Sequence, residues 1–297
     1  MRVWRRWLGS GDRTALGRAV GEVARLARRC SEEFPATPYL AGWCTVCGQP
    51  TVFFCDDLRL ARESLVCAHC RCTSRYRALA GGILRALREI AGADADSLAG
   101  LPAEGASRIA VYDTQVALRA ARGAYPLPDF LGRLSWVDLH LSAFRPSMAW
   151  GASVAGGVTN QNLEALSFPD AAFDLVVTSD VMEHVRLAER AHREIRRVLR
   201  PGGAYVFTVP HDRARATTLE RVRVVDPEDP TRDEHLLEPE YHGDANSPED
   251  RALAYRVYGL DLDDDLRRLG FTVDYLRVDD PEHGIVNSEV FYCQVAG

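Results

Sequence analysis

The sequence contains no lysine, so all 36 of its basic residues are arginines. This absence excludes every chemistry that needs a lysine amine, such as a Schiff base or the phosphate-binding lysine of a P-loop. The 42 acidic residues outnumber the arginines and give a formal net charge of −6. Because phosphate groups bind surfaces with a surplus of cations, this charge argues against nucleic acid as the main partner.

Long apolar runs are also missing. No stretch approaches the roughly 18–20 apolar residues of a membrane-spanning helix, and the opening MRVWRRWLGSGDR lacks the apolar core of a secretory signal. We therefore expect a cytoplasmic protein with no membrane partner. In that reducing compartment the eight cysteines, most of them within residues 44–72, indicate a metal site rather than disulfides.

The length of the chain, 297 residues, exceeds the usual size of one compact core and predicts two domains. Helical patterns and the cysteines occupy residues 1–90, and the small, polar segment 91–107 is typical of a linker. Within residues 108–297, short apolar runs alternate with helical patterns. This alternation predicts an α/β fold, in which a Rossmann-like sheet carries helices on both faces.

Four cysteines form two Cys-x-x-Cys pairs with 19 residues between them. This spacing is typical of zinc sites in which each pair turns tightly and both sulfurs face one ion. Since four thiolates close the coordination shell, the zinc would be structural and the N-terminal domain would fold around it. The predicted ligands are Cys44, Cys47, Cys67 and Cys70. Three spare donors could replace one of them: Cys55, His69 and Cys72.

Two segments of the second domain resemble class I S-adenosylmethionine-dependent methyltransferases. They are NLEALSFPDAAFDLVVTSDVMEHV and REIRRVLRPGGAYVFTVP, and the resemblance extends over about residues 108–297. The cysteine module followed by RYR, and the later EYHGD and YGLDLDDDLRRLGF, are similar to a bacterial subgroup with a zinc-binding head. The resemblance implies S-adenosylmethionine as cofactor and a small-molecule acceptor, in a specialised biosynthetic pathway.

The predicted cofactor site lies where strands of the sheet end, because ligands of open α/β sheets bind outside the carboxyl ends of the strands. We expect Asp138, at the end of the second strand, to accept hydrogen bonds from the ribose, and Asn162 to contact the adenine. Thr114 and Gln115 follow the first strand in place of the glycine-rich loop that the family usually has there. The full predicted set is Asp113, Thr114, Gln115, Asp138, Asn162, Leu163, Ser179 and Asp180.

Candidate bases for the reaction are His184, His211, Tyr241 and His242. A neutral imidazole can accept a proton near neutral pH, although His184 could instead cap or pack the start of a helix. The last two lie in a polar, proline-rich segment, about residues 211–256, whose length is typical of a binding loop or lid. A solvated surface loop is the alternative interpretation of that segment.

Three functions fit these features. The first is methyl transfer to a small molecule. The second keeps the cofactor but cyclises or cleaves its amino-acid arm, an option left open by the missing glycine loop. The third is an inactive methyltransferase-like scaffold that binds a protein or RNA. The acidic strand end at Ser179 and Asp180, the EHV sequence and the PGG turn favour an enzyme.

Overall fold

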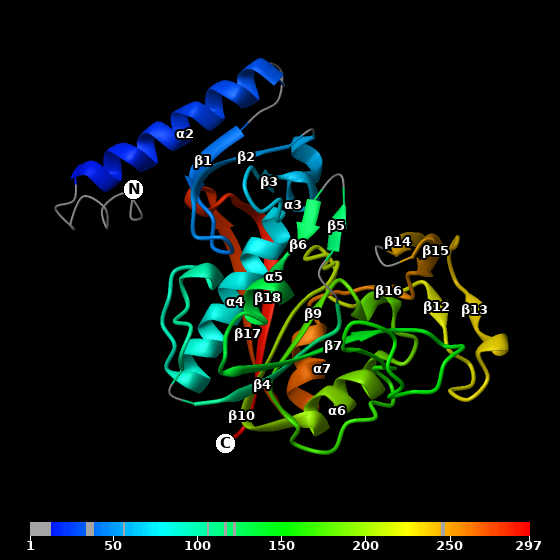
Figure 1. Cartoon of the computed structure of the whole chain (residues 1–297). Helices are drawn as coiled ribbons and strands as arrows, with labels where there is room; N and C mark the ends of the chain where they lie inside the picture. Colours follow the sequence, from blue (N-terminus) through cyan, green and yellow to red (C-terminus); the bar gives the residue numbers. More distant parts are fainter. Residues whose placement is uncertain are drawn as a thin grey trace. The chain divides into compact units, whose positions relative to one another are not determined.

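A computed structural model describes residues 13–33, 39–55, 57–105, 107–115, 118–120, 123–244 and 247–297 (Figure 1). The chain forms two compact units. Unit 1 comprises Met1–Gly105, Arg119–Ser135 and Arg277–Ser288, and unit 2 comprises Ala106–Leu118, Trp136–Leu276 and Glu289–Gly297. Among the described residues, no helix combines the length and the apolar character needed to cross a membrane.

Unit 1 contains a three-stranded antiparallel sheet in the order β1-β2-β3. Its helix α4 buries Leu79, Ile83 and Leu87 along one face and ends at Gly92, whose φ of 65° is the left-handed conformation that closes many helices. The remaining elements follow in chain order: α2 (Arg13–Glu33), β1 (Tyr39–Trp43), β2 (Pro50–Phe54), η1 (Leu58–Leu60), α3 (Ala61–Ser64), β3 (Val66–Cys67), α4 (Ser74–Ala91) and η2 (Leu98–Gly100).

Two later segments belong to unit 1, although the sequence analysis assigned residues 108–297 to one domain. One holds β6 (Gly123–Tyr125), α5 (Leu127–Leu131) and most of β5 (Leu118–Ala120). The other is the tip of a long hairpin, in which Gly284 has a φ of 62° and an added Cβ would lie 2.3 Å from the Phe53 ring. The expected linker 91–107 contains η2, and both Leu98 and Leu101 are buried. Each of these segments is thus packed into unit 1.

Arg77 is a fully buried arginine in α4 that ties these segments together. Its guanidinium donates hydrogen bonds to the backbone oxygens of Cys72, Leu65 and Gly284, at 2.5, 2.8 and 2.5 Å. It also lies over the Phe53 ring, 4.3 Å from the centroid. These acceptors pair with both terminal nitrogens of the buried guanidinium, whereas Nε has no hydrogen-bond partner among the described residues. Arg77 thereby links the cysteine region, the segment before β3 and the hairpin tip into one core.

Unit 2 is built on a seven-stranded sheet in the order β17-β18-β10-β9-β4-β7-β8, which confirms the predicted Rossmann-like α/β class. The neighbours from β10 to β8 pair in parallel, and β18 pairs antiparallel to β10. The strands are β4 (Ile109–Asp113), β7 (Val137–Ala143), β8 (Val158–Asn160), β9 (Phe173–Ser179), β10 (Leu199–Thr208), β17 (Phe271–Asp280) and β18 (Ile285–Val295). Strands β17 and β18 run on into the hairpin tip of unit 1 (Figure 1).

Helices α6 (Ala188–Val198) and α7 (Leu262–Arg268) contribute to one apolar core with side chains from five strands of the sheet. Ile195 and Leu266 are fully buried in this core. Burying an aliphatic or aromatic side chain of this size stabilises a fold by roughly 1.5–3 kcal/mol, so this layer holds the two helices on the sheet. Alternate strand residues on the opposite face, such as Val177 and Val206, are also fully buried.

The Pro201-Gly202-Gly203 turn lies inside β10, just after α6 ends, and shifts the register between β10 and β9. Gly202 has a φ of 78°, and a Cβ at Gly203 would come within 3.0 Å of two backbone oxygens. Glycine is therefore required at both positions, the first for its conformation and the second for space. The turn allows the helix to pass directly into the next parallel strand.

Candidate active site

The carboxyl ends of β4 and β9 bring together residues that the sequence placed in the cofactor site. The backbone N–H of Thr114 donates to the Val177 oxygen at 3.2 Å, and the Gln115 side-chain amide donates to the Ser179 oxygen at 2.9 Å. Asp113, which is fully buried, accepts a hydrogen bond from the Gln115 backbone N–H at 3.0 Å. The predicted cofactor residues that follow β4 therefore lie beside those at the end of β9.

Asp180 turns the chain sharply where β9 ends. Its φ of 48° is left-handed, a conformation that aspartate tolerates better than most residues. Its backbone N–H donates to the Thr208 oxygen at 2.9 Å, and its carboxylate accepts a hydrogen bond from the Thr208 hydroxyl at 2.8 Å. Thr208 also lies 3.1 Å from the Ser179 hydroxyl. Sequence reasoning missed Thr208, although its place at the end of the next parallel strand was a signal.

Thr114 carries a buried hydroxyl that has no hydrogen-bond partner in the part of the chain that the structure describes. A buried hydroxyl without a partner costs free energy, so such a group at the carboxyl end of β4 fits a site that gains a partner when a ligand binds.

The expected position of Asp138 was wrong. Strand β7 runs from Val137 to Ala143, so Asp138 is its second residue and pairs with Ala110, near the amino-terminal edge of the sheet. Its side chain is 49% exposed and lies 3.7 Å from both Arg108 and His140. The ribose contact was expected because Asp138 was placed at the end of the strand. The carboxyl end of β7 instead lies five residues further on, at Ala143.

Asn162 and Leu163 follow β8, where the sequence placed them. The Asn162 side-chain oxygen accepts a hydrogen bond from the Glu164 backbone N–H at 3.0 Å, which forms a local turn. Leu163 belongs to the apolar core beneath α6 and α7. The neighbouring Asn160, which sequence reasoning missed, is fully buried and its side-chain amide donates to three carbonyl oxygens of the preceding loop.

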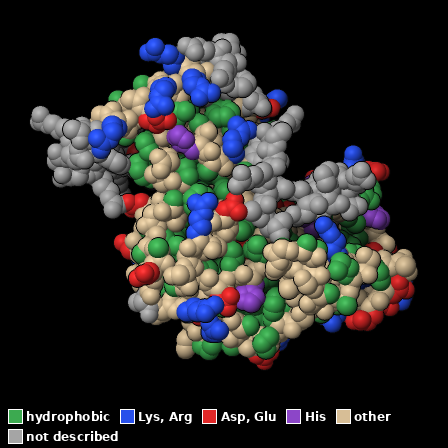
Figure 2. Space-filling view, in the orientation of Figure 1, with side chains coloured by type: hydrophobic (Ala, Val, Ile, Leu, Met, Phe, Trp, Pro, Cys, Tyr) green, Lys and Arg blue, Asp and Glu red, His purple; other side chains and the backbone are tan. Residues whose placement is uncertain are grey.

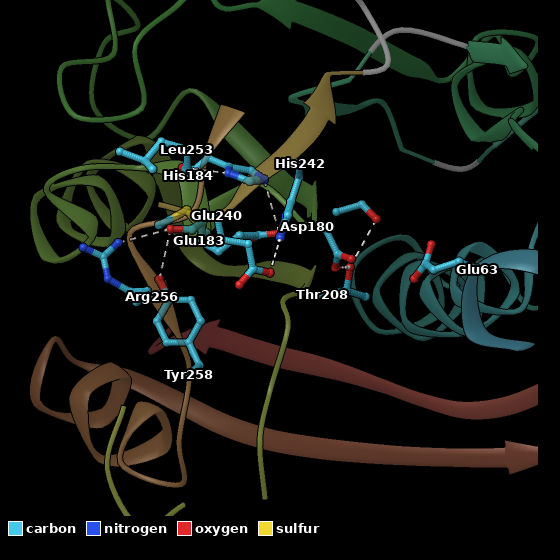
Figure 3. Close-up of polar contacts among 12 residues, drawn as sticks. Glu63, Asp180, Glu183, His184, Thr208, Glu240, His242, Leu253, Arg256 and Tyr258 are labelled. Carbon is cyan, nitrogen blue, oxygen red and sulfur yellow. Dashed lines mark hydrogen bonds and ion pairs between the residues drawn. The ribbon is translucent and has the colours of Figure 1, made fainter. Parts of the chain in front are cut away.

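Glu183, His184 and His242 form a compact cluster after β9 (Figure 3). The first two lie in η3 (Met182–His184), and the third lies in β14 (Tyr241–Asp244). One oxygen of Glu183 lies 3.5 Å from His184 Nε2 and 3.9 Å from His242 Nδ1. Glu183 is only 1% exposed, whereas the His242 side chain is 36% exposed. The cluster therefore has a buried floor and an accessible rim.

Of the other two candidate bases, Tyr241 precedes His242 on β14, and His211 follows the end of β10. His211 is buried, and its Nδ1 and Nε2 lie 2.9 Å from the Glu289 carboxylate and 3.1 Å from the Gly259 oxygen. Both ring nitrogens therefore lie within hydrogen-bond distance of another group of the fold. Tyr241 is 49% exposed and pairs through its backbone with Leu253.

The long segment after His211 is an ordered insertion held by two arginines. Arg256 is 6% exposed and donates to the backbone oxygens of Val185 and Arg186, at 2.5 and 3.0 Å. Arg186 binds both carboxylate oxygens of Asp233 at 2.7 Å. The short strands of the insertion are β11 (Leu219–Glu220), β12 (Val222–Arg223), β13 (Glu234–His235), β14, β15 (Ser247–Leu253) and β16 (Arg256–Val257). These contacts fix the insertion against the start of α6.

The four predicted zinc ligands of unit 1 converge. Their sulfurs all lie within 4.8 Å of one another, with Cys44 Sγ 3.7 Å from Cys70 Sγ and Cys47 Sγ 3.9 Å from Cys67 Sγ. Sulfurs bound to a tetrahedral zinc at about 2.3 Å lie about 3.8 Å apart, which these distances match. Cys72 is a fifth sulfur, 3.6 Å from Cys44 Sγ.

Each cysteine pair is closed by a left-handed residue. The Gly48 N–H donates to the Cys44 oxygen at 2.9 Å, and the Arg71 N–H donates to the Cys67 oxygen at 3.0 Å. The φ angles of these two residues are 67° and 64°. Arginine adopts this conformation only at a cost of roughly 1–3 kcal/mol, so the repeated turn is imposed by the convergence of the sulfurs.

Charged side chains are mixed on the surface. On the face drawn in Figure 2, the arginines of the described residues lie singly or beside acidic side chains and do not merge into a continuous basic surface. Ion pairs between neighbouring surface residues, such as Arg193 with Glu189 and Arg85 with Glu89, are examples of this mixing.

Comparison with known proteins gives a family match for part of unit 2. Residues 137–207 match the model of a methyltransferase domain, and no curated protein matches the chain. The similar solved structures include an S-adenosylmethionine-dependent methyltransferase from Mesorhizobium loti, 17% identical, with 63% of this chain and 91% of that chain covered and a TM-score of 0.39.

Two further similar structures are a glycopeptide N-methyltransferase, MtfA, and a 4+2 cyclase, SpnF. MtfA is complexed with S-adenosyl-L-methionine and is 18% identical, with 65% of this chain and 89% of that chain covered and a TM-score of 0.39. SpnF is 18% identical, with 66% and 60% covered and a TM-score of 0.36. The matched segment begins with β7 and extends almost to the end of β10, so the similarity to a methyltransferase domain covers the four parallel-paired strands of the sheet other than β4.

Proposed function

We propose that the protein transfers a methyl group from S-adenosylmethionine to a small-molecule acceptor, in a bacterial specialised biosynthetic pathway. This proposal rests on one observation. The Gln115 side chain donates a hydrogen bond to the Ser179 backbone oxygen at the carboxyl edge of the sheet, next to the turn at Asp180. The matched methyltransferase segment includes β9 and nearly all of β10, and so contributes one wall of that edge.

The proposed cofactor ligands follow from the contacts at this edge. Thr114 would supply its buried hydroxyl, and the backbone around Ser179 and Asp180 would hold the methionine portion. The bound cofactor supplies an activated methyl group, and the chain has to orient the acceptor in line with it and exclude water. Rigid turns such as Asp180 suit this task, because misplacement by about 1 Å can slow such a reaction about 100-fold.

The acceptor would lie near the cluster of His184 and His242. These imidazoles come after β9 and from the ordered insertion, and the partial exposure of His242 leaves the cluster accessible to a small molecule. Its imidazoles could orient the acceptor or receive its proton. Tyr241, exposed on the same strand, is a further candidate for contacting the acceptor.

In unit 1 we propose one structural zinc ion bound by Cys44, Cys47, Cys67 and Cys70. The support is the set of sulfur separations, which match a tetrahedral zinc site, and the two equivalent turns that present the sulfurs. Arg77 would stabilise this site from outside, because its guanidinium lies 3.7 Å from Cys72 Sγ and binds the Cys72 backbone oxygen.

The second function, cyclisation or cleavage of the amino-acid arm of the cofactor, is favoured by one observation. Among the described residues between β4 and β7, the longest helix is the five-residue α5, and no glycine-rich loop follows β4. A different loop after β4 could place the amino-acid arm of the cofactor, rather than its methyl group, next to a reacting atom.

One experiment separates these functions. The purified full-length protein is incubated with S-adenosylmethionine and candidate small molecules, and the products are identified by mass. S-adenosylhomocysteine together with a methylated acceptor supports methyl transfer. Methylthioadenosine supports the alternative reaction. If S-adenosylmethionine does not bind the protein at all, as measured by calorimetry, both proposals fail and a binding scaffold remains.

A further inference from the structure

The cluster of Glu183, His184 and His242 is held in place by the hairpin formed by β14 and β15. The same hairpin supplies His242 and ends at Leu253, whose backbone oxygen lies 3.0 Å from His184 Nδ1. Directly after it, the Tyr255 N–H donates to the Glu183 backbone oxygen at 2.8 Å. Two segments far apart in the sequence are therefore fixed against each other at this point (Figure 3).

The hydrogen bonds of the two imidazoles define which nitrogen carries the proton. His184 Nδ1 faces a carbonyl oxygen, which can only accept, so this nitrogen must donate. His242 Nε2 lies 3.2 Å from a carboxylate oxygen of Glu240 and must also donate. In the neutral rings the opposite nitrogens, His184 Nε2 and His242 Nδ1, then carry lone pairs.

Both lone pairs are close to the same oxygen of the buried Glu183 carboxylate. The separations of 3.5 and 3.9 Å exceed a normal hydrogen-bond distance, and such a convergence of three electron-rich atoms is stabilised by a proton or a metal ion between them. Ligands about 2.0–2.1 Å from a tetrahedral zinc lie about 3.3 Å apart, so the two oxygen–nitrogen separations exceed those of a bound set by about 0.2 and 0.6 Å. Movement of the two imidazoles toward Glu183 would bring them into coordination.

We propose that Glu183, His184 and His242 bind one divalent transition-metal ion. Two imidazoles and one carboxylate are the donor set that suits zinc, iron, manganese or cobalt better than calcium or magnesium. In metal sites the second nitrogen of each histidine ligand usually donates to a backbone carbonyl or a carboxylate, as His184 does to Leu253 and His242 to Glu240. Glu240 is itself held by Arg221 at 3.1 Å.

This site differs in kind from the cysteine site of unit 1. Three protein ligands leave open coordination positions for water or a small molecule, whereas four thiolates leave none. The exposed rim at His242 gives access to these positions. If the proposed methyl transfer is correct, on which this last step rests, the ion would bind an oxygen of the acceptor and lower the pKa of its hydroxyl.

Zinc uptake by the full-length protein tests the proposal. The protein is produced with zinc so that the cysteine site is filled, dialysed against a weak chelator, and titrated with zinc chloride in a calorimeter. We expect one further equivalent to bind to the wild type. Glu183→Gln and His242→Ala should each weaken this uptake about tenfold or more, because each removes one of three ligands.

The matched control is His235→Ala, since His235 is an exposed histidine on another hairpin of the same insertion. It should bind zinc like the wild type. Circular dichroism of each variant checks folding, and His242→Ala removes a partly exposed side chain and so keeps the test available if Glu183→Gln unfolds. The proposal is overturned if the wild type binds no further zinc, or if every folded ligand variant binds it unchanged. No methyl donor is present, so this result is independent of the proposed transfer.

Discussion

The imidazoles of His184 and His242 meet edge to face, with ring centroids 4.8 Å apart and planes at 88°. One ring follows a central strand of the sheet, and the other comes from the insertion between β10 and α7. Neither segment alone forms a site for chemistry. The cluster of Glu183, His184 and His242 therefore combines residues that follow β9 with a residue of the insertion.

The first prediction concerns turnover. His242→Ala should lower the rate of S-adenosylhomocysteine release about 100-fold or more, because it removes a group that orients or deprotonates the acceptor. Its effect on S-adenosylmethionine affinity should be small, since the cofactor ligands lie at the ends of β4 and β9. Both quantities are measured on the same preparation. His235→Ala is the control. If the two variants turn over at the same rate, His242 has no role in the reaction.

The second prediction concerns the cofactor edge. Thr114→Val replaces a buried hydroxyl by a methyl group of the same shape, and should weaken S-adenosylmethionine binding by about 0.5–1.5 kcal/mol, or about two- to tenfold. Asp138→Ala should leave the affinity unchanged, because Asp138 lies near the other end of its strand. Calorimetric titration of both variants checks this. If Asp138→Ala binds S-adenosylmethionine more weakly and Thr114→Val binds it unchanged, Asp138 rather than Thr114 contacts the cofactor.

The sequence was sufficient to predict features that depend on local pattern. The four cysteines converge as their spacing indicated, and β9 ends at Ser179 as its apolar run indicated. The sheet was predictable because its buried strands are short apolar runs and the amphipathic helix α6 separates β9 from β10. Gln115 and Ser179 meet because adjacent parallel strands end at one edge.

Features that depend on the whole fold were not predictable in this way. Asp138 and His140 interrupt the apolar pattern of β7, in which every residue except Ser142 is partly exposed, so the apolar run was too short to mark the end of the strand. Arg77 has the sequence character of a surface residue, yet its three acceptors come from segments that only tertiary packing brings together. The same holds for the hairpin tip, which packs into unit 1 although it follows the sheet strands in sequence.

The third prediction concerns the metal of unit 1. Cys67→Ala should abolish zinc binding at the cysteine site and lower the thermal stability of the unit, because structural zinc supplies folding free energy. Cys72→Ser should keep the zinc if Cys72 is a spare sulfur beside the four ligands. Metal analysis combined with thermal unfolding measures both effects. A zinc content unchanged in Cys67→Ala and reduced in Cys72→Ser would exchange the roles of the two cysteines.

The last prediction uses His192, which lies in α6 between the sheet and the solvent-facing helix surface. Its side chain is 4% exposed, and within the described residues neither ring nitrogen has a hydrogen-bond partner. Burial, assisted by the nearby Arg256, lowers the pKa of His192 from 6.5 to about 3. The folded protein therefore keeps this imidazole neutral at acidities where the unfolded chain protonates it.

The sign of the effect follows from proton binding. Between pH values of about 6.5 and 3 the unfolded chain binds the extra proton, so the free energy of unfolding falls as the pH falls through this window. Going from about pH 7.5 to about pH 5, His192 should account for a loss of about 2 kcal/mol. His192→Phe keeps an aromatic ring beside Tyr205 and Phe207 and cannot be protonated. Urea unfolding of both proteins at the two pH values should show a smaller loss in the variant, and equal losses would show that His192 is not held neutral in the fold.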